Sequence, residues 1–447
     1  MTSFKLTHDW TAAGHDNPEI FHTMANLALH IGNVNLMQNE DIWAKTIRDS
    51  VLVSAYPLAM WLASSWWRLN FEPLPVHGVI PSTDWRMAHE MGAVNHGFVW
   101  PKVLFASDCE VMQIWGVSSS ANTQQSVRYL NGLDIPASIK LADFQRSLEK
   151  FIGSVLSRLD AVGCRNTDLW NLWQLIQEER SDPQSLNYRR LEAELGYDPD
   201  ECSETIMIKA QTLEQQMGTE ALSELAPVYG KIAGDSSLNA IEDIIDSPGL
   251  AGTPNMPTLQ KAKSTRDAPW QRGVAVAREL RESLSKRDGV IDNKQLYDLL
   301  GLSTPAVEGW KPTTRNNAAI AIPDKNKRFK FVPRKAHPMA KRFELARLLG
   351  DYILTGSTEG QWLTSTDLST SRQKFQRAFA AEFLCPIDAL KDFLQSDFCE
   401  SAIEDATEHF QVSQTTVNSL LRNNGLIFSP FMGDYAEARL PYQLGAC

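Results

Sequence analysis

Residues 342–351 read Arg-Phe-Glu-Leu-Ala-Arg-Leu-Leu-Gly-Asp, and this stretch decides how the C-terminal part of the chain is interpreted. We interpret it as a helix. Glu344, Arg347 and Asp351 stand at positions i, i+3 and i+7, so a helix places them on one stripe. Two carboxylates with a guanidinium between them predict a ladder of ion pairs. Either the ladder is a solvated surface feature that adds little stability, or its arginine takes the place of another positive charge.

The stretch has the frame of a zinc peptidase helix without its reactive groups. Such a helix carries His-Glu-x-x-His, in which histidines four residues apart bind one Zn²⁺ and the glutamate takes a proton from metal-bound water. Residues 342–351 resemble the Arg-Phe-x-Leu-Ala-His-Glu-Leu-Gly-His stretch of the ImmA/IrrE-like peptidase family. Arg347 and Asp351 stand at the histidine positions, and Leu348 stands at the position of the glutamate.

A second stretch carries the same resemblance. Residues 379–386 read Phe-Ala-Ala-Glu-Phe-Leu-Cys-Pro, which is similar to the family's Phe-Ala-Ala-Glu-Leu-Leu-x-Pro. The family's third zinc ligand is a glutamate four residues before the first phenylalanine, where this chain has Phe375. The resemblance therefore implies a degenerate copy that retains the apolar packing residues, namely Phe343, Leu345, Leu349, Gly350, Phe379, Ala380, Leu384 and Pro386.

The substituted positions exclude zinc hydrolysis at this place, and we expect no cofactor. A guanidinium stays protonated and does not coordinate a metal, and a leucine moves no proton. We expect Arg347 to fill the place of the metal's charge, with Leu348 in or beside a collapsed cleft. His89-Glu90 with His96 is a weaker candidate for an active site, because histidines seven residues apart lack the zincin spacing.

The resemblance extends over residues 268–447, with an opening helical part at 270–302 and a small helical tail at 406–426. A stretch rich in Pro, Gly, Ser and Thr at 246–267 predicts a linker. The net charge of the chain is −11, and most of it lies before the resembling part. We predict an α+β, mostly α fold. An acidic α+β domain of unknown family spans residues 1–245 and precedes a zincin-like pseudo-metallopeptidase domain.

The N-terminal pattern predicts the following elements: an irregular start over about 40 residues, a helix from about residue 40 through 55, a hairpin of strands at 98–105 and 110–117, a strand pair at 127–130 and 137–139, and helices from 141 to 233. The uncharged stretch Val51–Trp67 is at the short limit for a membrane span, so we interpret it as buried. We expect Trp61, Trp66, Trp67, Trp170 and Trp173 to lie mainly in the core rather than at an interface.

Cysteine spacing and the first residues indicate the compartment. The six cysteines are widely spaced, with no Cys-x-x-Cys pair, which is typical of free thiols in a reducing cytoplasm. The first eight residues lack the basic and then apolar pattern of a signal peptide. We therefore expect a cytoplasmic protein that does not engage a membrane.

Two stretches are candidates for nucleic-acid binding. Residues 325–335 alternate basic and aromatic side chains, which suits phosphates and stacked bases or, equally, a strand with one basic face. Residues 412–423 resemble the second helix of a helix-turn-helix, with Ser413 as N-cap, although the peptidase family uses a similar tail for packing. The candidate contacts are Lys325, Lys327, Arg328, Lys330, Arg334 and Lys335, and in the tail Thr415, Thr416, Asn418 and Arg422.

The resemblance implies a function as well as a fold. ImmA/IrrE-like peptidases recognise and cut repressors or antitoxin-like proteins in stress, mobile-element and phage-response circuits. A degenerate copy is expected to bind a protein partner that is encoded nearby, without cutting it. The alternatives are a DNA-binding regulator and, less favoured, an enzyme with its site around His89, Glu90 and His96.

Overall fold

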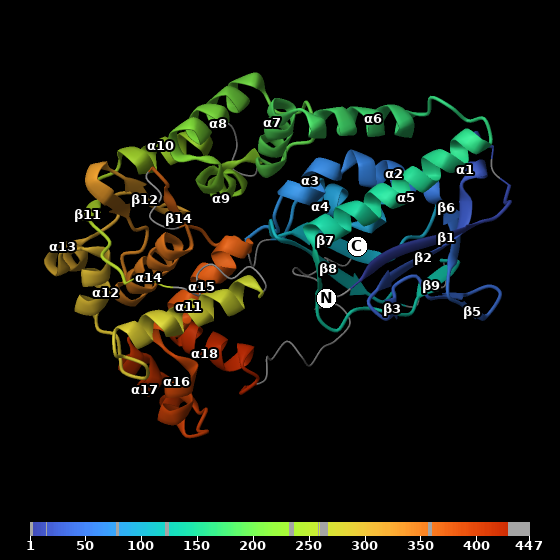
Figure 1. Cartoon of the computed structure of the whole chain (residues 1–447). Helices are drawn as coiled ribbons and strands as arrows, with labels where there is room; N and C mark the ends of the chain where they lie inside the picture. The colour runs from blue at the N-terminus through green and yellow to red at the C-terminus, as the bar shows by residue number, and fades with distance from the viewer. Residues whose placement is uncertain are drawn as a thin grey trace. The chain divides into compact units, whose positions relative to one another are not determined.

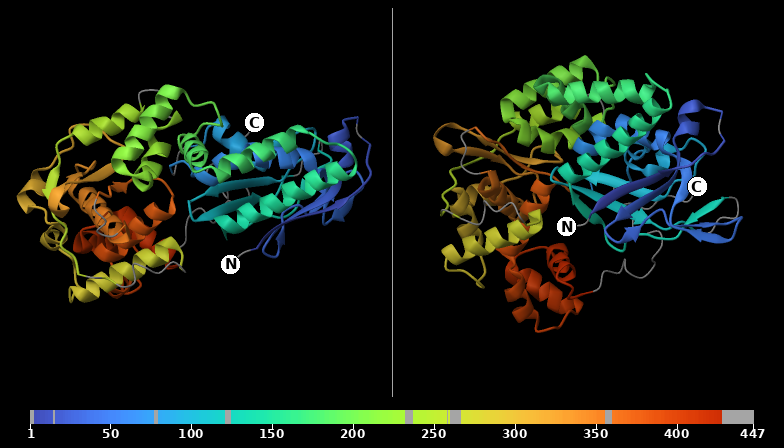
Figure 2. Two further views of the ribbon diagram at one scale, coloured as in Figure 1. Left: turned by 45° about the horizontal axis from the view of Figure 1, so that its top comes forward. Right: turned by 45° about the vertical axis from the view of Figure 1, so that its right-hand side comes forward.

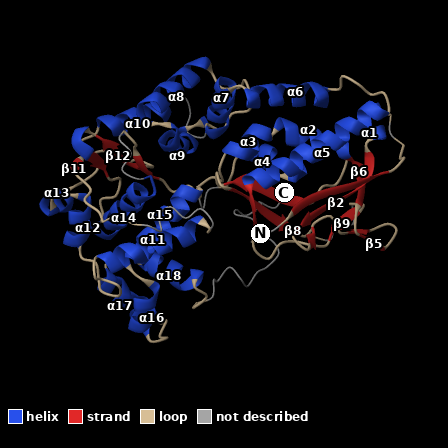
Figure 3. Ribbon diagram, viewed as in Figure 1, coloured by secondary structure: helices blue, strands red, loops and turns tan. Residues whose placement is uncertain are grey.

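The computed structural model describes residues 3–14, 16–76, 80–120, 125–231, 237–257, 259, 267–355 and 360–427 (Figure 1). Helices hold 52% and strands 16% of the structure, so the expectation of an α+β, mostly α protein is confirmed (Figure 3). The chain divides into two compact units, Met1–Ser203 and Glu204–Met432. This division lies well before the linker predicted at 246–267, and strand β11 (Leu250–Gly252) forms inside that stretch.

The described part of unit 1 has three small antiparallel sheets and a set of helices. The sheets have the orders β1-β2-β3 with β6 also on β2, β10-β8-β7, and β5-β4-β9. The elements are β1 (Phe4–Trp10), α1 (Pro18–His22), β2 (Met24–Ile31), β3 (Val34–Asn35), β4 (Asn39–Asp41), β5 (Thr46–Arg48), β6 (Val51–Ser54), α2 (Ala55–Ser64), α3 (Trp66–Phe71), α4 (Thr83–His89), the 3-10 helix η1 (Met91–Val94), β7 (Lys102–Ser107), β8 (Val111–Val117), β9 (Val127–Tyr129), β10 (Ala137–Lys140), α5 (Leu141–Ala161), α6 (Asp168–Ser181) and α7 (Pro183–Glu194).

The long amphipathic helix α5 packs on strands of unit 1 (Figure 2). It buries Phe144, Leu148, Ile152, Val155 and Leu159, which recur at helical spacing, so one apolar stripe faces the core. The predicted hairpin is also present. β7 and β8 pair in register from Lys102–Val117 to Ser107–Met112. These two predictions are confirmed.

The secondary structure of the first 55 residues differs from the prediction. β1 and β2 lie in the stretch predicted to be irregular, and β4, β5 and β6 replace the predicted helix. The strands form in place of a helix because of the turn between β4 and β5. In this turn the Asp41 side chain accepts a hydrogen bond from the Ala44 N–H, and Lys45 has a positive φ of 53°. That turn brings the chain back on itself, although Trp43 and Ile47 stand four apart as in a helix.

Two other N-terminal predictions are confirmed in part. Strands β9 and β10 form where expected, but they pair with β4 and β8 rather than with each other. Trp61, Trp66, Trp67 and Trp173 are buried, whereas Trp170 is 44% exposed. The stretch Val51–Trp67 is β6, α2 and the start of α3. Among the described helices, none has the length and apolar character needed to cross a bilayer.

The described part of unit 2 contains one four-stranded antiparallel sheet of order β11-β13-β12-β14 with helices packed on it. Its elements, besides β11, are α8 (Glu204–Met217), α9 (Thr219–Tyr229), α10 (Ser237–Asp246), α11 (Pro269–Ser283), α12 (Asn293–Leu300), α13 (Thr304–Gly309), β12 (Ala319–Pro323), the 3-10 helix η4 (Lys325–Lys327), β13 (Phe329–Val332), α14 (Pro338–Thr355), β14 (Leu363–Ser365), α15 (Ser371–Leu384), α16 (Ile387–Leu394), α17 (Glu400–Phe410) and α18 (Gln414–Asn423).

Helix α15 lies in close contact with both α11 and α14. A Cβ added at Gly350 of α14 would lie 2.6 Å from Cδ1 of Phe379, and one added at Gly273 of α11 would lie 2.5 Å from the Phe375 carbonyl oxygen. Both distances are shorter than a carbon–carbon or carbon–oxygen contact allows, so the helices approach this closely because these residues are glycines. The retained glycine at position 350 therefore has a packing role.

Candidate degenerate catalytic centre

The four positions that the predicted resemblance assigns to zinc ligands and catalytic base are all buried. Arg347, Leu348 and Asp351 lie on α14, and Phe375 lies on α15 (at most 4% exposed in each case). Leu348 and Phe375 belong to the apolar core of unit 2. The structure thus brings together the positions that the sequence analysis grouped, and it places them inside the unit rather than at its surface.

Phe375 begins an aromatic column along α15. Its ring stacks on Phe379 at a centroid distance of 6.4 Å, and Phe379 stacks on Phe383 at 5.6 Å, with rings within 9° of parallel in both cases. The residue at the position of the third ligand is therefore part of the packing between helices. Leu348 is fully buried in the same apolar core.

Asp351 is fully engaged by groups of its own chain. Its Oδ1 accepts from Nε of Arg372 at 2.7 Å, and its Oδ2 accepts from Nη2 of Arg372 at 2.7 Å and from the Thr364 N–H at 2.8 Å. Burial disfavours the charge of Arg372, yet the adjacent Asp351 carboxylate raises the pKa of Arg372 above its usual value. The Asp351 carboxylate is thus committed to a buried ion pair.

Arg347 has less compensation for its charge. Its Nη2 donates to the Thr366 carbonyl oxygen and to Oε1 of Gln373, and its Nη1 lies 3.7 Å from Oδ1 of Asp367. Its Nε is buried without a hydrogen-bond acceptor among the described residues. Burial, followed by repulsion from Arg377 and Arg334, lowers the pKa of Arg347 to about 9.

The predicted ladder along α14 is wrong. Glu344 pairs with Arg334 at 2.7 Å, Asp351 pairs with Arg372, and Arg347 forms an ion pair with neither. The stripe faces β14 and α15 instead of solvent, so each side chain meets a partner from another element. Since Arg347 is turned away from both carboxylates, the idea that it takes over the metal's charge is also wrong.

Polar side chains occupy the outer edge of strand β14. The Thr364 N–H donates to Asp351, and the Thr364 carbonyl oxygen accepts from Nε2 of Gln373 at 3.3 Å and from Nε2 of Gln376 at 2.8 Å. Because β14 pairs with β12 on its other side, these bonds replace those that a further strand would make.

The next outward-facing residue is held in the same way. The Thr366 N–H donates to Oε1 of Gln373 at 3.0 Å, and its carbonyl oxygen accepts from Arg347. The Gln373 amide thus bonds to residues i and i+2, as a neighbouring backbone does. An edge strand with paired backbone groups offers no template for an added peptide strand, so this edge is closed in the structure.

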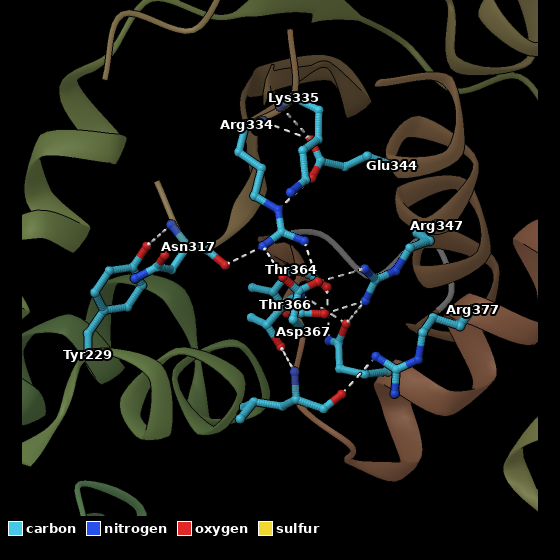
Figure 4. A network of polar contacts seen from close by, with 12 residues as sticks. Tyr229, Asn317, Arg334, Lys335, Glu344, Arg347, Thr364, Thr366, Asp367 and Arg377 are labelled. Carbon is cyan, nitrogen blue, oxygen red and sulfur yellow. Dashed lines mark hydrogen bonds and ion pairs between the residues drawn. The ribbon is translucent and has the colours of Figure 1, made fainter. Parts of the chain in front are cut away.

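Arg334 links the end of β13 to this network (Figure 4). Its Nε donates to Oε1 of Glu344 at 2.7 Å, its Nη1 and Nη2 donate to the two oxygens of Asp367, and Nη1 also donates to the Asn317 carbonyl oxygen. The backbone N–H of Asn317 donates to the hydroxyl of Tyr229 on α9 at 3.1 Å. Arg334 is buried and committed, which corrects its assignment as a nucleic-acid contact.

The other candidate nucleic-acid contacts do not share one strand face. Lys325, Lys327 and Arg328 lie exposed at the β12–β13 turn, and Lys335 is exposed beyond β13. Lys330 on β13 is half-buried, and its Nζ donates to the carbonyl oxygens of Ile245 and Ser247 at the end of α10. A lysine at a helix C-terminus stabilises the unpaired carbonyls there, so Lys330 has a structural partner.

The C-terminal helices form as predicted, but their charge disfavours DNA. Ser413 caps α18 by accepting a bond from the Thr416 N–H. Thr415 and Arg422 are exposed, and Thr416 and Asn418 are half-buried. The exposed acidic side chains of α16, α17 and their connection outnumber Lys391 and Arg422, and they are Asp388, Asp392, Asp397, Glu400, Glu404, Asp405 and Glu408.

The histidine candidates of unit 1 do not converge. His89 is buried between the Phe105 carbonyl oxygen and Glu72, with its ring stacked on Trp85 at 4.0 Å. His96 lies in a separate turn, bonded to the Val94 carbonyl oxygen. Within the residues that the structure describes, no group of three or more His, Cys, Asp or Glu side chains is arranged to hold a metal ion.

The polar partners of the centre were not foreseen from the sequence. Arg372, Gln373 and Gln376 share one side of α15. The Thr370 hydroxyl donates to the carboxylate of Glu224 on α9, with its oxygen 2.8 and 2.9 Å from the two carboxylate oxygens. Burial raises the pKa of Glu224, and the nearby Arg372 opposes that rise.

Comparison with known proteins adds no relative. No family model, curated protein or solved structure matches the chain.

Proposed function

We propose that this protein is a pseudo-metallopeptidase that binds a protein partner without hydrolysing it. One observation carries the proposal: the four positions that would hold zinc ligands and base are inside the core of unit 2, and their side chains are committed to packing or to internal polar bonds. Leucine and phenylalanine supply no metal ligand, and the Asp351 carboxylate is held by Arg372.

The closed edge of β14 supports the same proposal. A peptidase that holds its substrate as an added strand needs unpaired backbone groups at a sheet edge. Here Asp351, Gln373, Gln376 and Arg347 bond to those groups. A chain that binds a partner without cutting it does not need an open strand edge.

The proposed context follows from the family resemblance. The partner is a protein, of the repressor or antitoxin type that ImmA/IrrE-like peptidases cut, and the setting is a cytoplasmic stress or phage-response circuit. Binding would sense or sequester the partner. The DNA-binding alternative has lost support, because Arg334 and Lys330 have internal partners and the tail helices are acidic.

The test combines metal binding with the fate of the partner. Purified protein titrated with Zn²⁺ is expected to show no stoichiometric site, and elemental analysis is expected to find no zinc retained. Proteins captured from the native host by the full chain are expected to remain full length after incubation, with or without a chelator. A tightly held zinc together with chelator-sensitive cleavage of the captured protein would disprove the proposal.

A further inference from the structure

The side chain of Asp367 connects the buried ion network of unit 2 to solvent. It is 48% exposed, and its two oxygens accept from Nη1 and Nη2 of Arg334 at 2.9 and 2.6 Å. Two parallel N–H···O bonds of this kind are the usual way in which arginine recognises a carboxylate. Figure 4 shows the side chains of Arg334 and Arg347 pointing toward Asp367 from different elements.

Two further guanidinium groups lie beside this pair with incomplete compensation. Arg347 is 4% exposed, its Nε has no acceptor among the described residues, and its nearest carboxylate is Asp367 at 3.7 Å. Arg377 donates Nη1 to the Leu368 carbonyl oxygen at 2.8 Å. Burial lowers the pKa of Arg377, with Asp367 and Glu224 opposing that fall. Asp367, which Arg334 already binds, thus also lies near Arg347, and Arg377 bonds to the next residue in the chain.

The complete ion pairs of Arg372 and Arg334 in unit 2 show which contact Arg347 lacks. Arg372 has both Nε and Nη2 on the oxygens of Asp351, and Arg334 has Nε on Glu344 in addition to Asp367. Arg347 has no carboxylate within hydrogen-bond distance among the described residues. Repulsion from Arg377 and Arg334 adds to the effect of burial in lowering the pKa of Arg347. A buried cation without a partner is costly, and an added oxyanion removes that cost.

We propose that Arg347 and Arg377, next to the Arg334-bound Asp367, form an oxyanion-binding site that takes a carboxylate from an acidic segment of the partner. Asp367 is the resident carboxylate, and the incoming group competes with it. Because the resident group is a carboxylate, we assign the incoming group as a carboxylate rather than a phosphate. The identity of the ligand as part of a protein rests on the proposed function, whereas the site itself does not.

The experiment measures binding of malonate, a small dicarboxylate, to the full chain by calorimetry at constant ionic strength. Wild type is expected to bind weakly, because Asp367 competes. The Asp367→Asn variant keeps the size of the side chain and removes its charge, so it is expected to bind malonate at least tenfold more tightly. Asp298→Asn, which removes a surface carboxylate paired with Lys294, is the matched control and is expected to bind like wild type.

The arginines are tested in the Asp367→Asn background. Arg377→Gln is expected to weaken malonate binding at least tenfold, and Arg347→Gln is expected to do the same if circular dichroism shows that it folds. Equal binding by wild type, Asp367→Asn and Asp298→Asn overturns the site, and so does binding that survives Arg377→Gln. Inorganic phosphate bound more tightly than malonate overturns the carboxylate assignment. None of these outcomes involves zinc or a partner, so they are separate from failure of the proposed function.

Discussion

Arg372 and Asp351 form a two-point ion pair that joins α15 to α14, with both N···O distances at 2.7 Å and the Asp351 side chain fully buried. Removing one member leaves the other as an uncompensated buried charge. Arg372→Met is therefore expected to destabilise unit 2 by about 3–5 kcal/mol. Urea unfolding with hydrogen exchange of the α14 peptides measures this loss. The double variant Arg372→Met/Asp351→Leu is expected to recover part of it, and no recovery would contradict the pairing.

Arg347 is expected to behave differently from Arg372 although both are buried arginines. Arg347→Met leaves the Thr366 carbonyl oxygen without a donor, but it also removes a buried cation that lacks a close carboxylate. These effects oppose each other, so the free energy of unfolding is expected to change by less than about 1.5 kcal/mol. The same exchange measurement gives the comparison. A loss as large as that of Arg372→Met would show that Arg347 is fully compensated.

Gly350 tests the packing of α14 against α15. In Gly350→Ala the new methyl group meets the Phe379 ring at 2.6 Å, so α14 and α15 must separate. The expected cost is about 1–3 kcal/mol, as for other overpacked cores. Gly309→Ala is the matched control, because nothing lies within 4 Å of its added Cβ. Adding Phe379→Leu to Gly350→Ala is expected to restore part of the stability, and failure to do so would argue against this contact.

Local features of unit 2 were predictable from the sequence, whereas the partners of its charged groups were not. The frame residues around 342–351 and 379–386 predicted two helices, and α14 and α15 form there. The spacing of Glu344, Arg347 and Asp351 also fits a ladder along one helix. It gives no information on whether that stripe faces solvent or another element, and here it faces β14 and α15.

The N-terminal errors have a similar physical origin. Trp43 and Ile47 stand four residues apart, which suits a helix, but Trp43 lies in the tight turn between two short strands and Ile47 lies on the second strand. They are exposed by 76% and 71%, so the apolar spacing does not mark a buried helix face. The turn depends on a side-chain bond of Asp41 and on a positive φ at Lys45, and apolar periodicity reports neither.

Glu224 is expected to make the stability of unit 2 depend on pH. Burial raises the pKa of Glu224 in the folded state above its usual value. Between the usual and the raised pKa, the folded protein therefore keeps a proton that the unfolded protein has released. Its contribution is therefore most favourable below the ordinary pKa and is lost as pH rises through the folded value. Glu224→Gln is expected to be more stable than wild type at neutral pH and to show a flatter pH profile. Glu404→Gln, on the exposed side of α17, serves as the control, and parallel profiles for Glu224→Gln and wild type would refute the prediction.

The DNA-binding alternative is tested at the exposed turn between β12 and β13. Lys327 and Arg328 are exposed, whereas Lys330 holds the end of α10 and must be left intact. Phosphate contacts release counterions, so any binding is expected to weaken steeply with salt, and Lys327→Glu/Arg328→Glu is expected to abolish it without unfolding the chain. Fluorescence anisotropy with a labelled duplex at low salt makes the measurement, with Lys294→Glu on α12 as a charge-reversal control elsewhere on the surface. We expect no binding by wild type even at low salt. Binding that the double variant loses and the control retains would revive the regulator alternative, because a basic turn would then contact phosphates independently of the buried residues of α14 and α15.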